Sequence, residues 1–293
     1  MPDQPVSPTV RVAWKLGATL RGARARLHRT GVDVAPMELL SGCGYRLKAV
    51  RVRPAGAGPL PAVVVSPAIH QGIDQLMTRA AVVSADEIAR LGYAVYLHDP
   101  AGRGESWGEE DYGGPEHQDD LRAVITAALA DPACNGALGV LSLSLGVAAA
   151  VGALSRWPGE LPARWLVDWE GPCDREIITA GGTIMVPALG HGLDDDAYWN
   201  CREATRGVAG LRCGYVRLQA QPDHAQPEEV RHAHRMIRAA AKGNLPWFQL
   251  NDHPRGEVPG RPHWAPGGPF AANRLVLGKL AALRLALGPT PDR

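Results

Sequence analysis

The chain has 293 residues, of which 45% are hydrophobic and 21% charged, and its formal net charge is +1. This composition is typical of a globular protein with a sizeable core, and the near-neutral charge argues against nucleic acid as a partner. No apolar run approaches the roughly 20 residues that a membrane-spanning helix needs. The five cysteines are widely spaced and show neither a disulfide framework nor zinc-type spacing, which favours a reducing cytoplasm as the location.

The first 33 residues are predicted to form a basic arm or helix outside the main domain. Residues 1–30 carry six lysines and arginines against one acid, Asp3. No continuous apolar segment follows them, so they do not form a secretory signal, although a targeting segment remains an alternative. Residues 34–293 are predicted to form one domain.

Strands and helices alternate along this domain. An antiparallel strand pair is expected within residues 34–53, and the later strands are expected at 62–66, 93–98, 139–143, 164–169, 214–219 and 247–250. Helices are expected at 76–91, 117–130, from about 146, at 228–242 and at 270–287, the last apolar over much of its circumference and therefore well buried. Such alternation predicts a mostly parallel sheet with helices on both faces and ligand sites at the carboxyl ends of the strands. Residues 170–210 break the rhythm and are predicted to be an insertion or lid over the site.

A serine follows the strand that starts at Gly139. Ser144 is the centre of the pattern Ser142-x-Ser144-x-Gly146, a variant of the nucleophile elbow in which Ser142 stands where glycine is commoner. The turn is tight, so the flanking positions must be small, and it presents the hydroxyl beside the first amides of a helix. Ser144 is therefore the predicted nucleophile, and the alternative is a serine that only caps the helix.

Four motifs in this order resemble the α/β-hydrolase family. They are His70–Gly72 after the third strand, Asp99–Ser106 after the fourth, Ser142–Gly146 after the fifth, and Asp223 after the seventh. The resemblance covers residues 52–287 and is nearest to the dienelactone-hydrolase-like and peptidase-like serine esterases. It implies the α/β-hydrolase fold, a small-molecule ester as substrate, and neither cofactor nor metal.

The resemblance also implies an acid and a base for Ser144. Asp223 is expected to orient the histidine, with Asp168 and Glu170 after the sixth strand as the runner-up acids. An ordinary turn aspartate is the alternative for Asp223, since Pro222 precedes it.

The histidine is expected shortly after the last strand, where two candidates stand. His253 is closest to the strand end and is the first choice, and His263 lies nearer the final helix. His224, directly beside Asp223, is the third candidate, and Asp252 could then orient it across the loops.

The oxyanion hole is expected to come from two backbone amides. One is the N–H of Leu145, which follows the nucleophile. The other is expected from the loop after the third strand, at Gln71 or its neighbour, where Gly72 lets the loop pass close to the substrate.

Two other polar segments are not expected to do chemistry. The loop Asp99–Ser106 is interpreted as structural, with Asp99 or Arg103 tethering neighbouring loops. His191 and the run Asp194–Asp196 suggest a solvated loop, because adjacent carboxylates cannot all face one metal ion.

These observations favour a serine hydrolase that cleaves a carboxylic ester through an acyl-enzyme on Ser144. A peptidase or an acyltransferase with the same triad is the first alternative, because the leaving group is set by loops. A non-catalytic binding protein on the same fold is the second. Homo-oligomer formation is left open.

Overall fold

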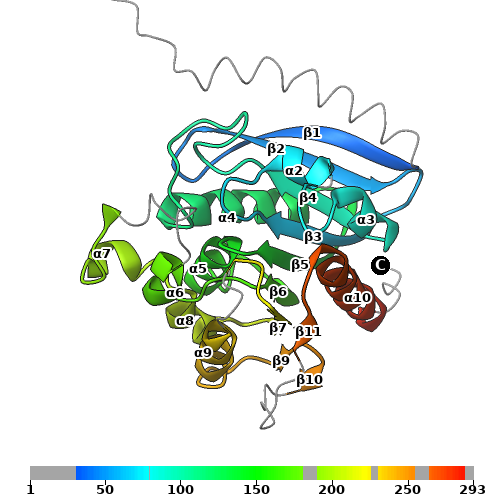
Figure 1. Ribbon diagram of the computed structural model, residues 1–293. Helices are drawn as coiled ribbons and strands as arrows, with labels where there is room; N and C mark the ends of the chain where they lie inside the picture. Colours follow the sequence, from blue (N-terminus) through cyan, green and yellow to red (C-terminus); the bar gives the residue numbers. More distant parts are fainter. Residues whose placement is uncertain (1–30, 79, 181–189, 226–229, 255–263, 288–293) are drawn as a thin grey trace, which may run out of the picture.

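A computed structural model describes residues 31–78, 80–180, 190–225, 230–254 and 264–287 (Figure 1). Within them nine strands form one sheet in the order β1-β2-β4-β3-β5-β6-β7-β9-β10. The strands are β1 (Val32–Leu40), β2 (Arg46–Pro54), β3 (Leu60–Ser66), β4 (Ala94–His98), β5 (Cys134–Leu143), β6 (Trp165–Trp169), β7 (Gly214–Leu218), β9 (Phe248–Leu250) and β10 (His253–Pro254). The six from β4 to β9 in that order are parallel, while β1, β2 and β10 run antiparallel to their neighbours.

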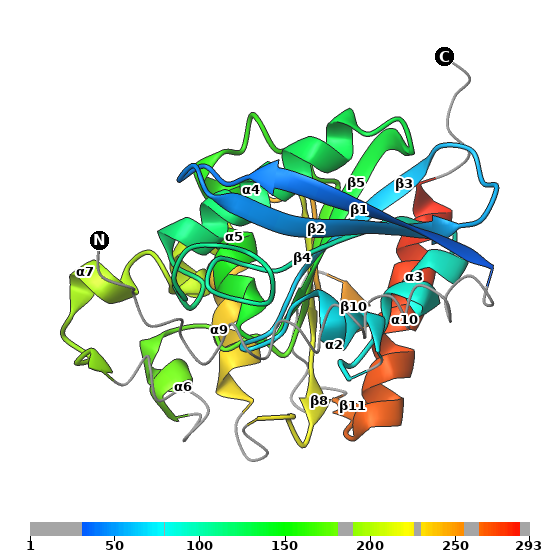
Figure 2. The same cartoon turned by 90° about the horizontal axis from the view of Figure 1, so that it is seen from above.

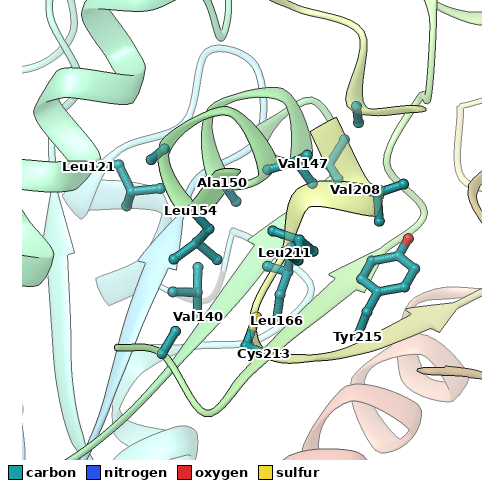
Figure 3. Close-up of a cluster of buried hydrophobic side chains, with 14 of the residues drawn as sticks. Leu121, Val140, Val147, Ala150, Leu154, Leu166, Val208, Leu211, Cys213 and Tyr215 are labelled. Carbon is teal, nitrogen blue, oxygen red and sulfur yellow. The ribbon is translucent and has the colours of Figure 1, made fainter. Parts of the chain in front are cut away.

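Helices cover both faces of this sheet, because successive residues of each central strand are apolar and point to opposite faces. The helices are α2 (Ile73–Met77), α3 (Ala85–Arg90), α4 (Pro115–Ala130), α5 (Gly146–Arg156), α6 (Arg175–Ala180), α7 (Asp196–Trp199), α8 (Ala204–Gly207), the 3₁₀ turn η2 (Val208–Gly210), α9 (Arg231–Ala240) and α10 (Pro269–Ala286). On one face α4, α5 and α9 pack around Val140, Leu166 and Tyr215 (Figure 3). On the other, α3 and α10 pack around Leu141, Val167 and Val216. The predicted α/β architecture is thus confirmed.

The parallel strands deliver their following loops to a single edge. The loops after β3, β5, β6 and β7 meet there, close to the short sheet of β8 (Ala220–Gln221) and β11 (Ala265–Pro266), which Figure 2 shows beside the start of α10. This edge is where the sequence predicts the site. No helix in the described ranges is long and apolar enough to cross a membrane.

Two predicted helices differ from the structure. The expected helix 76–91 is broken, because Ser84 starts a new helix as an N-cap residue whose backbone N–H donates to the Glu87 side chain at 2.9 Å. The final helix is less buried than expected. Only the stripe of Ala272, Val276 and Leu280 is buried, while Phe270 and Leu285 are more than four-fifths exposed.

The predicted insertion at 170–210 contains α6, α7 and α8. In Figure 1 these short helices lie on the side of α5 and α9; α8 packs against both of those helices. A lid role for the segment stays a prediction, as does the domain boundary at residue 33, since residues 1–30 lie outside the described ranges.

Candidate active site

Ser144 stands on a strained turn between β5 and α5. Its φ is +49°, a left-handed value that non-glycine residues rarely adopt. The backbone N–H of Ser144 donates to the carbonyl of Trp169 at 2.9 Å, which ties the turn to the end of β6. A β-carbon at Gly146 would collide with the carbonyl oxygens of Ser66 and Pro67. The elbow therefore requires glycine at that position, as the sequence pattern predicts.

The imidazole of His224 lies against the Ser144 hydroxyl. The distance between His224 Nε2 and Ser144 Oγ is 3.0 Å, within reach of a hydrogen bond from the hydroxyl to the ring. His224 follows β7 and β8, and its ring is tilted by 31° over the Trp169 ring with 4.4 Å between centroids. The Trp169 ring thus covers one face of the imidazole.

The acid nearest to His224 is Glu170, at the end of β6. Its Oε2 lies 2.8 Å from His224 Nδ1 and also accepts the backbone N–H of His224 at 3.0 Å. Its Oε1 accepts the backbone N–H of Ala220 at 2.8 Å. Glu170 is 2% exposed and has a φ of +48°. The turn thus brings the carboxylate under the histidine, and both of its oxygens are hydrogen-bonded.

Asp223, the acid expected from the sequence, lies farther from the imidazole. Its Oδ1 is 3.5 Å from His224 Nδ1, and its Oδ2 lies 2.8 Å from Gln219 Nε2 and 3.2 Å from His232 Nε2. Burial disfavours its charged form, but the hydrogen bonds from His232, Gln219 and the backbone of Ala225 hold the pKa of Asp223 below its usual range. Asp223 is therefore a charged carboxylate near the His224 ring but farther from it than Glu170. Glu170, a runner-up acid, makes the direct contact with Nδ1.

The other runner-up acid, Asp168, faces away from the site. Its Oδ2 accepts hydrogen bonds from Arg217 Nη1 at 2.8 Å and from the Tyr215 hydroxyl at 2.7 Å, and all three side chains are buried. Asp168 therefore balances a buried guanidinium within the sheet.

The first-choice histidine is corrected by the structure. His224 faces the Ser144 hydroxyl, whereas the backbone of His253 pairs with Leu250 in β10, beyond β9 at the sheet edge. That edge lies on the far side of β6 and β7 from β5, so the loop after β7 is the shorter path to the serine. His263 lies outside the described residues. The structure thus places the acid, Glu170, after β6 rather than β7. It places the base, His224, after β7 rather than β9.

The two amides expected to form the oxyanion hole differ in whether their N–H groups already have a hydrogen-bond partner. The N–H of Leu145 starts the helical turn beside Ser144 and has no partner among the described residues. The N–H of Gln71 donates to the carbonyl of Ala68 at 3.1 Å, so it is already used within its own turn. A neighbouring amide of the loop 68–72, rather than that of Gln71 itself, is therefore the second donor that we expect.

Arg103 holds the loop 68–72 in place through hydrogen bonds to its backbone. Its Nη1 donates to the carbonyls of Ala68 at 2.7 Å and Gln71 at 3.2 Å, while Glu110 accepts from its Nε at 2.6 Å and its Nη2 at 2.7 Å. Asp99 accepts the backbone N–H of Ile73 at 2.8 Å. The structural role predicted for the loop Asp99–Ser106 agrees with these contacts.

A cleft of about 570 Å³ opens over the serine and the histidine. Its apolar walls come from small side chains of three loops and from the start of α10, among them Ala68, Ala81, Val82, Ala220 and Ala272. The charged or titratable residues of the described part that line it are Glu170, Asp223 and His224. A second hollow, of about 600 Å³, lies around Arg164, Trp165 and Trp247, away from these groups.

One cluster has the ligand types of a metal site. Glu170, Asp223 and His224 offer ligand atoms that lie within 4.8 Å of one another. His224 Nδ1 and Glu170 Oε2 are already partners of each other, so the arrangement is complete as a protonated Nδ1 on a carboxylate. The His191 segment does not gather its acids, since His191 pairs with Asp195 at 2.7 Å and Asp196 pairs with Arg175 at 2.8 Å.

Comparisons with known proteins identify a family and a fold. A family model described as X-Pro dipeptidyl-peptidase (S15 family) matches residues 43–197, slightly more than half of the chain. No curated protein sequence matches.

Several solved structures share the fold. An esterase from Pyrococcus furiosus is 14% identical, with a TM-score of 0.61 over 87% of this chain and 89% of its own. Brefeldin A esterase, described as a bacterial homologue of human hormone-sensitive lipase, is 18% identical, with a TM-score of 0.59 over 98% of this chain and 90% of its own. A prolyl endopeptidase is 16% identical, with a TM-score of 0.62 over 90% of this chain and 38% of its own. At such identities the likeness shows the fold, and it confirms the predicted α/β-hydrolase architecture.

Proposed function

Because this chain belongs to the X-Pro dipeptidyl-peptidase (S15) family and is a serine hydrolase of the α/β-hydrolase superfamily, we propose that it cleaves a carboxylic ester through an acyl-enzyme on Ser144. One observation carries the proposal. Ser144 Oγ, the two ring nitrogens of His224 and Glu170 Oε2 form a line with steps of 3.0 and 2.8 Å. This is the order of nucleophile, base and acid that activates a serine.

The reaction follows from the roles of these atoms. His224 Nε2 takes the hydroxyl proton as Ser144 Oγ attacks the ester carbonyl, and Glu170 stabilises the imidazolium through Nδ1–H. The N–H of Leu145 and an amide of the loop 68–72 receive the oxyanion. The imidazolium then gives its proton to the departing alkoxide. In the second half, His224 takes a proton from water as the water oxygen attacks the acyl carbon, and the imidazolium then returns this proton to Ser144 Oγ as the carboxylic acid leaves.

The cleft supports an ester of a small uncharged acid. Its apolar walls suit a short acyl group, and both carboxylates of its described lining already face His224. Neither is left to bind the free ammonium group of a peptide. Peptide cleavage after proline is the second candidate, favoured by the family that matches residues 43–197.

The test compares two substrates and three variants. Wild type is expected to hydrolyse p-nitrophenyl butyrate faster than alanyl-proline p-nitroanilide and to be labelled by a fluorophosphonate. The variants Ser144→Ala and His224→Ala should each lose about 10⁴-fold or more in kcat, as for removal of a triad member. The control His253→Ala should keep the wild-type rate.

Each other outcome points elsewhere. Labelling of Ser144→Ala at the wild-type level would show that Ser144 is not the nucleophile. A fall in kcat in His253→Ala with none in His224→Ala would show that the base is His253, after β9. Faster cleavage of the anilide would make the protein a peptidase.

A further inference from the structure

A second carboxylate faces the ring nitrogen that the triad acid binds. Asp223 Oδ1 lies 3.5 Å from His224 Nδ1, while Glu170 Oε2 lies 2.8 Å from the same atom. Both acids are buried. A hydrolase needs one acid at this nitrogen, so the presence of two is unexplained by the mechanism above.

Asp223 is held in place from the opposite side by a buried chain of side chains. Its Oδ2 is 3.2 Å from His232 Nε2, and His232 Nδ1 is 3.0 Å from Arg217 Nη2. A guanidinium has only donors, so Nδ1 of His232 is the acceptor and its ring proton sits on Nε2, aimed at Asp223. The carbonyl of Gly171 lies 3.2 Å from the same Nδ1 but already accepts from Arg217 Nη1 at 2.6 Å.

These hydrogen-bonded side chains fix Oδ2 of Asp223, while its Oδ1 faces the His224 ring. Oδ1 accepts the backbone N–H of Ala225 at 2.8 Å, which is a neutral partner that does not cancel its charge. A turn aspartate needs only such a backbone contact. The buried links to His232, Arg217 and Gln219 exceed that need, and they keep a full negative charge beside His224.

We propose that Asp223 is a positioning residue that shares the Nδ1 proton of His224 with Glu170 and replaces Glu170 when it is lost. The proposal rests on the proposed function, since it assigns His224 as the base. Glu170 is the nearer partner in the resting enzyme. When Glu170 is neutral, a small rotation of the imidazole brings Nδ1–H to Asp223 Oδ1 and preserves the tautomer that leaves Nε2 free to accept the serine proton. Loss of that tautomer is the reason that neutralising a sole triad acid costs about 10⁴ in kcat.

The experiment measures kcat and KM for p-nitrophenyl butyrate in four variants. Glu170→Gln is expected to lower kcat by only about 10²-fold, and Asp223→Asn by about 10-fold or less, with KM little changed in both. The double variant should fall by about 10⁴-fold or more, beyond the product of the single losses, because no carboxylate then remains at Nδ1. The control is Asp252→Asn, an exposed acid paired with Lys279, which should keep the wild-type kcat.

A conservative exchange separates positioning from mere support of the fold. In the Glu170→Gln background, Asp223→Glu lengthens the side chain by one methylene toward Nδ1 and is expected to recover about 10-fold in kcat. The strongly deshielded proton resonance of Nδ1–H should persist in Glu170→Gln and vanish in the double variant. The recovery by Asp223→Glu and the persistence of the resonance in Glu170→Gln decide the question even if Asp223→Asn does not fold.

The outcomes distinguish this proposal from the proposed function. If Glu170→Gln alone loses about 10⁴-fold and Asp223→Glu recovers nothing, Asp223 is only structural while the Ser144–His224–Glu170 triad stands. If Ser144→Ala keeps the wild-type rate, the function itself fails. Additive single losses, with the deshielded proton absent from Glu170→Gln, would also overturn the shared proton.

Discussion

A buried acid outside the active site provides a quantitative test of the electrostatics of this fold. Asp120 lies on the inner face of α4, and its Oδ2 accepts the backbone N–H of Ala101 at 2.8 Å, at the start of the loop that carries Arg103. Its Oδ1 is buried without a hydrogen-bond partner among the described residues. The pKa of Asp120 is raised to about 7, chiefly by burial and also by the nearby charges of Glu116 and Asp119, while the hydrogen bond from Ala101 opposes the rise.

The direction of the pH dependence follows from this displacement. The folded state holds the proton of Asp120 more tightly than the unfolded chain does, so its contribution to stability is complete below pH 3.8 and is lost as the pH rises through about 7. Each pH unit of displacement corresponds to about 1.4 kcal/mol. Ionised Asp120 therefore costs the folded protein about 4 kcal/mol at most above pH 7. Asp120→Asn, which resembles the protonated acid at every pH, removes this cost.

Urea unfolding followed by tryptophan fluorescence measures the effect. The free energy of unfolding of Asp120→Asn should exceed that of wild type by about 1.5 kcal/mol at pH 5 and by about 4 kcal/mol at pH 8. The matched control Asp119→Asn changes the adjacent, less buried acid and should stay within about 0.5 kcal/mol of wild type at both pH values. An equal difference at pH 5 and pH 8 for Asp120→Asn would refute the reasoning, because a buried carboxylate that ionises must make the difference grow.

Two further predictions concern the elbow and the loop opposite it. Gly146→Ala should lower the free energy of unfolding by about 1–3 kcal/mol and abolish ester hydrolysis, since its β-carbon meets the Ser66 carbonyl. Gly278→Ala, with no atom within 4 Å of its added carbon, should fold and react as wild type; a normal rate in Gly146→Ala would contradict the tight elbow. Arg103→Lys keeps the charge but loses the guanidinium that holds the Ala68 carbonyl. Because an oxyanion donor of the loop 68–72 is then displaced, kcat should fall by about 10–10²-fold with KM little changed. A loss confined to KM would show that Arg103 acts on substrate binding.

The sheet could be predicted from the sequence because its central strands carry continuous apolar runs. The run 62–66 and the strand before Ser144 are buried on both faces, and such runs are typical of parallel strands between two helix layers. The elbow could be predicted for a related reason. Gly146 and Ser142 are small because backbone passes close to both, and that requirement is visible in the sequence.

The helix boundaries show where periodicity is insufficient. The apolar pattern at 76–91 continues through a break, although Ser84 and Glu87 form a capping box that the sequence displays. The composition of the last helix suggested burial all around. A helix that covers one face of a sheet fully buries only one stripe, so Leu275, Leu277 and Leu283 are only partly buried and Leu285 stays exposed.

The choice of acid and base depended on backbone geometry that no local pattern encodes. The left-handed φ of Glu170 turns its carboxylate under the ring, and nothing in the residue type requires that value. His224 was recognisable only through its neighbours, since it follows Asp223 directly and both come shortly after β7. The usual place of the histidine in the family argued for His253 instead.

The loop after β9, where the histidine was expected, supports the other loop. Asn251 accepts the backbone N–H of Gln219 at 2.9 Å and donates to the Gln219 carbonyl at 3.0 Å, so it closes both backbone groups at the end of β7. The side chain of Gln219 in turn donates to Asp223 Oδ2 at 2.8 Å. Because Asn251 binds the backbone and Gln219 binds the acid, the segment that carries Asp223 and His224 is fixed from the neighbouring strand. The loop after β9 thus supports the loop that carries the base. This support explains how the His224 side chain can be 30% exposed and still lie 3.0 Å from Ser144.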